Sequence, residues 1–166
     1  MHMLPKMIIP ANLKSMLDDA VHSELYASNL YKHIANQLQR IGYFGTAKFF
    51  LNESADELKH YQLHVEFQND VGTVAEVPSI EAMDEKIENL SDAIELGYET
   101  ELDLYESYKR WYQQAAVDPV VQQFLLQFLE IQRTSVGEYG DLLARIELVD
   151  QDKAGMLLID QELGEG

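Results

Sequence analysis

The chain has 166 residues, 46% of them hydrophobic, which is enough for a single domain over residues 1–166 with a buried core. Asp and Glu outnumber Lys and Arg by 29 to 12, giving a net charge of −17, which excludes nucleic-acid and anionic-membrane partners and favours cations. Cys is absent, so disulfides and thiolate metal sites are excluded, and no apolar run approaches the ~20 residues of a membrane span. We expect a soluble protein of a reducing compartment, the cytoplasm.

Helical periodicity dominates the chain, and a few prolines and glycines divide it into long segments. The first segment starts after Pro10 and stops before Gly42, and Asn89 or Ser91 is placed to cap the third. The predicted helices span 11–41, 44–71, 90–116, 119–149 and, for a short fifth segment, 153–163.

The connections between these segments predict how the helices are arranged. The first two segments, and likewise the third and fourth, are joined by a few residues, so each pair forms antiparallel neighbours. Residues 72–89 form a much longer connection, which at ~3.3 Å per residue can return along a whole bundle. We therefore expect an all-α fold, a four-helix bundle over about residues 10–149 with one long crossover and a short C-terminal fifth helix.

Polar residues interrupt the apolar stripes of the predicted helices. Glu24, Glu101 and Gln132 each stand where the 3–4 spacing calls for an apolar residue. In the second segment Glu57 and His60 are three residues apart and share a helix face. At ~1.5 Å per residue, each segment places its polar position roughly 20–25 Å from its tight turn, so all four levels coincide at mid-bundle.

Three buried carboxylates at one level repel one another unless a cation neutralises them. No Lys or Arg falls in the stripes near this level, so a metal ion is the expected neutraliser. Carboxylate oxygens with one imidazole suit iron, manganese or zinc. Glu57 is placed to bridge two ions, with Glu24 and His60 completing the first and Glu101 the second.

The fourth segment differs from that of a symmetric di-iron bundle. Such bundles carry Glu-x-x-His on two helices, whereas here Gln132 and Ser135 stand where the second Glu and His would be. The second ion is therefore expected to be held more weakly. A strong site beside a weak one suits oxidising iron and passing it on, more than retaining a permanent di-iron cofactor.

Four short motifs and the tail carry a family resemblance that covers about residues 10–163. They are Glu24-Leu25-Tyr26 with Tyr31, Glu57-Leu58-Lys59-His60, Thr100-Glu101-Leu102, Glu130-Ile131-Gln132, and the tail from Gly155 to Leu163. Together they resemble the non-haem ferritins of the bacterial type. The resemblance implies a ferroxidase that oxidises Fe(II) to Fe(III) with O₂ or peroxide and stores ferric mineral in a homo-oligomeric cage, usually of twenty-four subunits.

The resemblance also implies roles for individual residues. Glu24, Glu57 and His60 would bind the first iron, Glu57 and Glu101 the second, and Gln132 would lie beside the second iron. Tyr31 would lie close enough to hydrogen-bond and donate an electron. Two features of the family are not expected: a third iron site, because Ile131, Thr134 and Ser135 occupy the matching positions, and haem, because the fourth segment lacks Glu-x-x-His.

Other interpretations stay open. The bundle could serve a different di-metal oxidase or peroxide scavenger, or a storage or interaction subunit whose site is weak or a relic. Tyr31 is explained equally well by core packing, His64 is better explained by packing than as a ligand, and Tyr108 and Trp111 are expected to fill the core or an interface.

Overall fold

The computed structural model describes residues 3–166, and within that range it is helical with no strand. Its elements are listed here in chain order: the 3-10 helix η1 (Ala11–Leu13), α1 (Lys14–Ile41), α2 (Phe44–Asp70), α3 (Leu90–Gln114), the 3-10 helix η2 (Ala115–Val117), α4 (Pro119–Val149) and α5 (Lys153–Gly164). The five predicted helices are confirmed, except that the first turn of the first and the last turn of the third are 3-10. None of the described helices is long and apolar enough to cross a membrane.

The helix ends follow from local chemistry. Gly42 ends α1 with a φ of 101°, a left-handed conformation that glycine adopts without a Cβ clash. Of the two candidate caps of α3, Asn89 is the one used, and its side chain accepts from the Asp92 N–H at 2.8 Å. Pro119 opens α4, whose first free N–H groups donate to the Asp118 carboxylate.

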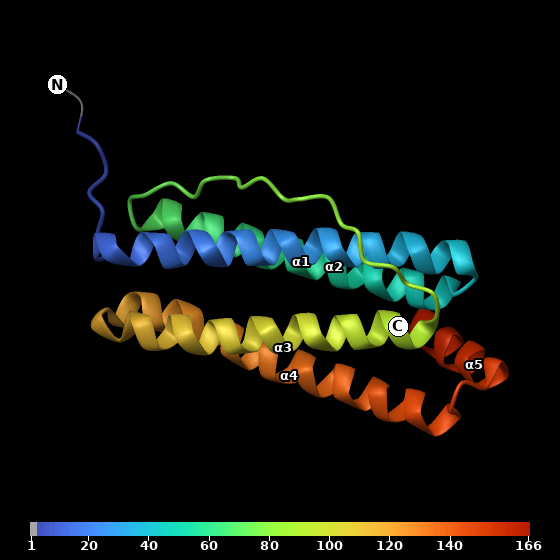
Figure 1. Cartoon of the computed structure of the whole chain (residues 1–166). Coiled ribbons are helices and arrows are strands. Elements are labelled where there is room, and N and C mark those ends of the chain that lie inside the picture. The colour runs from blue at the N-terminus through green and yellow to red at the C-terminus, as the bar shows by residue number, and fades with distance from the viewer. Residues whose placement is uncertain (1–2) are drawn as a thin grey trace.

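The helices form two antiparallel pairs, α1 with α2 and α3 with α4, which lie against each other (Figure 1). Residues 71–89 run along the outside of the α1–α2 pair and start α3 at the opposite end of the bundle, so α3 is antiparallel to α1 (Figure 1). The Gln37 side chain fastens this crossover to α1, accepting from the Ile87 N–H at 2.7 Å and donating to the Glu85 carbonyl at 2.6 Å. The predicted four-helix bundle with one long crossover is confirmed.

The fifth helix docks on the start of α2. The buried Asp160 carboxylate accepts from the Thr46 N–H and hydroxyl, each at 2.7 Å, and from the Gly45 N–H at 3.2 Å. An acid at this place also faces the positive end of the α2 dipole. Gly45 allows the close approach, because a Cβ there would lie 2.0 Å from the Asp160 carbonyl oxygen.

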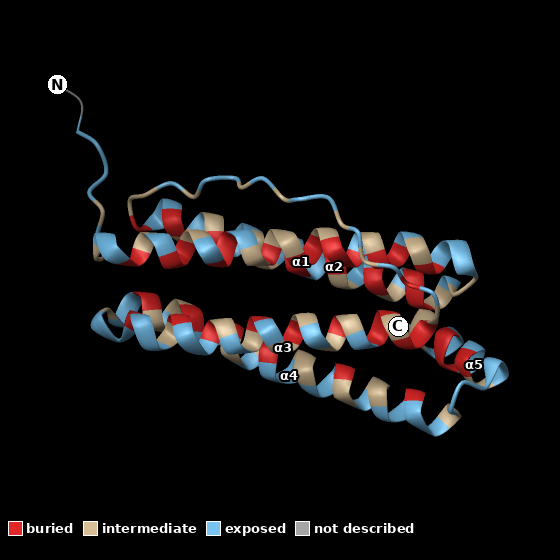
Figure 2. Ribbon diagram, in the orientation of Figure 1, coloured by how far each residue is buried: buried red, intermediate tan, exposed pale blue. Residues whose placement is uncertain are grey.

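Buried positions recur along the helix faces that are turned toward the other helices (Figure 2). Most of them are apolar or aromatic, as the 3–4 spacing predicts. Polar side chains also lie among them at mid-bundle, and four of these are the predicted site residues Glu24, Glu57, Glu101 and Gln132, each at most 4% exposed. Burying polar groups costs free energy unless they are paired or bind an ion, so these four side chains mark the middle of the bundle as a candidate functional site.

The α3–α4 contact depends on one glycine. A Cβ on Gly97 would lie 2.4 Å from Cε1 of Tyr139, whose buried ring is itself packed against Phe49 and Phe50 and cannot retreat. We expect Gly97→Ala to lower the free energy of unfolding by about 1–3 kcal/mol, because the methyl group overpacks the core. Thermal unfolding of the full chain measures this. Gly137→Ala, on the open side of α4 with no atom near the added Cβ, should instead stabilise the protein by ~0.5–1 kcal/mol. Equal effects of the two changes would contradict the packing argument.

Candidate metal centre

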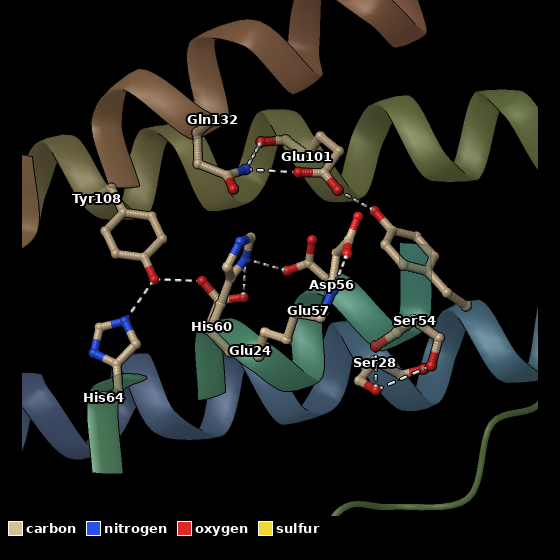
Figure 3. A network of polar contacts seen from close by, with 12 residues as sticks. Glu24, Ser28, Ser54, Asp56, Glu57, His60, His64, Glu101, Tyr108 and Gln132 are labelled. Carbon is tan, nitrogen blue, oxygen red and sulfur yellow. Dashed lines mark hydrogen bonds and ion pairs between the residues drawn. The ribbon is translucent and has the colours of Figure 1, made fainter. Parts of the chain in front are cut away.

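Three ligand atoms from α1 and α2 converge at mid-bundle (Figure 3). Oε2 of Glu24 lies 3.6 Å from Nδ1 of His60, and Oε2 of Glu57 lies 3.5 Å from the same nitrogen. A single metal could accept one atom from each of the three side chains, since those atoms all lie within 4.8 Å of one another. Glu57 and His60 reach the same point because residues three apart share a face of α2.

The spacing of these atoms fits a shared ion better than direct hydrogen bonds. The three atoms are buried, and none has a hydrogen-bond partner in the part of the chain that the structure describes. Donors about 2.1 Å from a metal and separated by tetrahedral angles lie about 3.4 Å apart. An imidazole nitrogen with two carboxylate oxygens is also a donor set suited to iron, manganese or zinc.

Electrostatics gives the cluster a counter-charge within the protein itself. Burial raises the pKa of Glu57 well above its ordinary value, and the neighbouring Glu24 carboxylate raises it further. Burial lowers the pKa of His60, but the carboxylates of Glu24 and Glu57 outweigh that effect and raise it to about 10. A protonated His60 is therefore the counter-charge that a metal ion would replace.

Glu101 on α3, predicted to bind the second ion together with Glu57, and Gln132 on α4, predicted to lie beside that ion, are hydrogen-bonded to each other. Oε1 of Glu101 accepts from the Tyr31 hydroxyl at 2.6 Å, and Oε2 accepts from Nε2 of Gln132 at 2.7 Å. The Gln132 amide also donates to the Glu101 carbonyl, and its own oxygen is buried without a partner among the described residues. Burial, followed by the charge of Glu57, raises the pKa of Glu101 to about 7. A second cation would have to compete with Gln132 for Glu101.

The predicted site residues therefore divide into two groups. The structure brings together Glu24, Glu57 and His60, while Glu101 and Gln132 pair with each other beside them. Tyr31 is both a core residue and a hydrogen-bond donor to Glu101. Ligation by any of these residues stays a prediction.

Sequence reasoning missed two participants, Tyr108 and His64. Tyr108 fills the core as expected, but its hydroxyl also donates to Oε1 of Glu24, and it lies 2.8 Å from Nε2 of His64 (Figure 3). A signal was available, because Tyr108 follows Glu101 by the seven residues that separate Tyr31 from Glu24. Two helical turns place a residue nearly above the first, on the same face.

A pocket of about 450 Å³ opens onto the cluster between α2 and α4. Glu57 and His60 are among its lining residues, so the pocket connects the cluster with one side of the bundle. The remaining lining residues are mostly acidic or hydroxyl-bearing: Glu53, Asp56, Glu130, Ile131, Arg133, Thr134, Ser135 and Glu138. The three positions where a third iron site was not expected, Ile131, Thr134 and Ser135, are among them.

Comparison with known proteins identifies the family. A family model described as a ferritin-like domain matches residues 14–149, the stretch that holds α1 to α4. The chain belongs to the ferritin family. The resemblance seen in the sequence motifs is thereby confirmed.

This ferritin is similar to bacterial and eukaryotic relatives over nearly its whole length. It is 27% identical to a probable bacterial non-heme ferritin-like protein of Haemophilus influenzae, over 95% of the chain and 96% of the relative. It is 28% identical to a ferritin of Pacifastacus leniusculus, over 89% and 84% respectively. An open pore ferritin of Archaeoglobus fulgidus shares the fold with a TM-score of 0.91 at 22% identity, covering 94% of this chain and 97% of that one.

Proposed function

We propose that this ferritin binds Fe(II) at the mid-bundle cluster, oxidises it to Fe(III) and stores the product as a ferric mineral in a homo-oligomeric cage, of twenty-four subunits as is usual in the family. The observation that carries the proposal is the convergence of three buried ligand atoms, on Glu24, Glu57 and His60, that have no hydrogen-bond partner within residues 3–166. Family membership supports iron as the cation. The net charge of −17 supports a cationic substrate.

The donor atoms suggest an order of binding. The first Fe(II) takes the free atoms of Glu24, Glu57 and His60 and displaces the proton of His60. The second takes Glu57 and Glu101 after the Gln132 amide releases Oε2 of Glu101. Two Fe(II) ions give one electron each, which reduces O₂ to peroxide with two protons from water. Tyr31 is hydrogen-bonded to Glu101 and therefore lies beside the proposed second ion, where it would hold that carboxylate in position.

The acidic pocket between α2 and α4 offers the oxidised iron a way out. Its carboxylates on Glu53, Asp56, Glu130 and Glu138 lie next to Glu57 and His60 and would attract Fe(III) leaving the cluster. Release toward a mineral also agrees with the weak second site, because an ion held by few free ligands is easily passed on.

Aerobic addition of Fe(II) to the metal-free protein tests the proposal, with ferric absorbance and O₂ consumption followed together. At two irons per chain we expect a fast phase that ends near that ratio, and with a large excess we expect slower growth of a soluble mineral. A protein that shows no fast phase would contradict oxidation at the cluster. Repeating the addition with peroxide in place of O₂ identifies the preferred oxidant.

One observation favours a second candidate, a storage subunit whose oxidation centre is incomplete. Both oxygens of Glu101 already accept a hydrogen bond, and α4 supplies Gln132 and Ser135 in place of a second Glu-x-x-His. Such a subunit would grow mineral only slowly and bind one ion per chain in the absence of oxygen. Anaerobic Fe(II) titration separates the candidates, since the proposed centre binds two ions in unequal steps.

A further inference from the structure

The bundle contains a reciprocal pair of tyrosine–glutamate hydrogen bonds. Tyr31 on α1 donates to Glu101 on α3, and Tyr108 on α3 donates to Glu24 on α1. Each tyrosine lies seven residues beyond the glutamate of its own helix, and the two helices are antiparallel, so the two bonds are related by an approximate twofold axis. The two glutamates differ in what else they contact.

The hydroxyl of Tyr108 also contacts the imidazole of His64. Nε2 of His64 lies 2.8 Å from the Tyr108 oxygen, and both side chains are fully buried. The imidazole is stacked on Phe128, with ring centres 4.5 Å apart, and meets the edge of Phe124 at 5.0 Å. Its Nδ1 has no hydrogen-bond partner in the described part of the chain. Burial lowers the pKa of His64 to about 3, so the ring is neutral at pH 7.

The hydrogen atoms available determine the direction of this chain of bonds. A carboxylate carries no hydrogen, so the Tyr108 hydroxyl donates its only one to Glu24. The contact between His64 and the Tyr108 oxygen is then a hydrogen bond only if Nε2 carries the single imidazole proton. The opposite tautomer would leave Tyr108 with one hydrogen for two acceptors.

We propose that His64 and Tyr108 position Glu24 so that it binds the first cation through Oε2 alone, an inference that rests on the metal site of the proposed function. Oε1 accepts a hydrogen bond from Tyr108, whereas Oε2 has no hydrogen-bond partner among the described residues and faces Nδ1 of His60 at 3.6 Å. Both oxygens of Glu101, by contrast, already accept a hydrogen bond, one from Tyr31 and one from Gln132. Tyr108 therefore keeps the first site preformed, with Glu24 as a monodentate ligand. The first ion binds before the second because Glu24 offers an oxygen without a hydrogen bond and Glu101 does not.

Anaerobic titration of the metal-free full chain with Co²⁺ tests the positioning role without any oxidation. In Tyr108→Phe we expect the first Co²⁺ to bind roughly 10–100-fold more weakly, which is the usual effect of removing a residue that hydrogen-bonds to a metal ligand. We also expect weaker visible absorption per bound ion, because a freed Glu24 carboxylate can bind through both oxygens and raise the coordination number. Tyr139→Phe, which removes an equally buried hydroxyl that lies near Glu53 and makes no hydrogen bond to Glu24, Glu57 or His60, should match the wild type.

Variants of His64 separate positioning from simple packing. His64→Gln keeps an N–H donor and should retain the wild-type Co²⁺ spectrum, whereas His64→Leu should move toward that of Tyr108→Phe. Wild-type affinity and spectrum in Tyr108→Phe would overturn the inference. So would ¹⁵N spectra that place the His64 proton on Nδ1 in the unmutated protein. Unchanged Co²⁺ binding in Glu24→Ala would instead overturn the metal site itself, and the positioning role with it.

Discussion

Replacing Glu57 with alanine is expected to abolish the fast oxidation of Fe(II), slowing it by more than about 100-fold. Even the mutation of a residue that only hydrogen-bonds to a metal ligand lowers affinity or activity roughly 10–100-fold, and Glu57 is proposed as a ligand itself. Glu57 is the carboxylate that the proposed centre shares between both ions. Its Oε2 is buried, free of hydrogen bonds to the described residues, and 3.5 Å from His60. Stopped-flow absorbance at two Fe(II) per chain measures the fast phase directly.

The comparison needs controls for folding and for charge. Glu66→Ala removes an exposed acid from the same helix and should leave the rate within about twofold of wild type, because surface changes away from special features have small effects. Glu57→Gln retains the side-chain volume and should be as slow as the alanine variant, which separates lost ligation from a cavity. A wild-type rate in either Glu57 variant would show that oxidation takes place elsewhere.

The metal-free protein is expected to lose stability as the pH rises from about 5 to about 8. Burial raises the pKa of Glu101 to about 7 and that of Glu53 to about 7. Through these two carboxyl groups the folded state binds more protons than the unfolded state between about 4.5 and 7. His64, whose pKa is lowered to about 3, has the opposite effect below about 6.5, but it is one group against two, so the free energy of unfolding still falls as pH rises through that window. For the almost fully buried Glu101, the shift corresponds to about 3 kcal/mol.

His60 acts in the same direction at higher pH. The carboxylates of Glu24 and Glu57 outweigh the lowering effect of burial and raise the pKa of His60 to about 10. The stabilising contribution of this charge is fully present below the ordinary histidine value of 6.5 and is lost as pH rises through about 10. Bound metal should reverse the trend, because the ligands must be deprotonated to bind.

Denaturant unfolding at several pH values, once with a chelator and once with Zn²⁺, measures how the free energy of unfolding changes with pH in the metal-free and the metal-bound protein. The chain concentration is kept constant, because assembly also affects apparent stability. Without metal the free energy of unfolding should fall with pH, and the stabilisation by Zn²⁺ should grow with pH. Glu101→Gln should flatten the metal-free curve between about 4.5 and 7, because its amide does not titrate. A metal-free protein that becomes more stable over this range would contradict the buried-carboxylate explanation.

Much of the fold is determined by local features of the sequence. Pro119 and Asn89 specify where α4 and α3 begin, and Gly42 specifies where α1 ends, because each acts on the backbone within one turn. The length of 71–89 determines the topology, since only a crossover of that length spans the bundle. The fixed rise of a helix then places Glu24 and Glu57 at the same level.

Tertiary structure alone decided which atoms of the cluster are free. Periodicity assigns Glu24 and Glu101 to inward faces, but it does not show that Tyr108 takes one oxygen of the first and that Tyr31 and Gln132 take both oxygens of the second. Those choices depend on how neighbouring helices are rotated about their axes and which rotamers their packed side chains adopt. Both are properties of the assembled core, in which Glu24 and Tyr108 become hydrogen-bond partners although they are 84 positions apart.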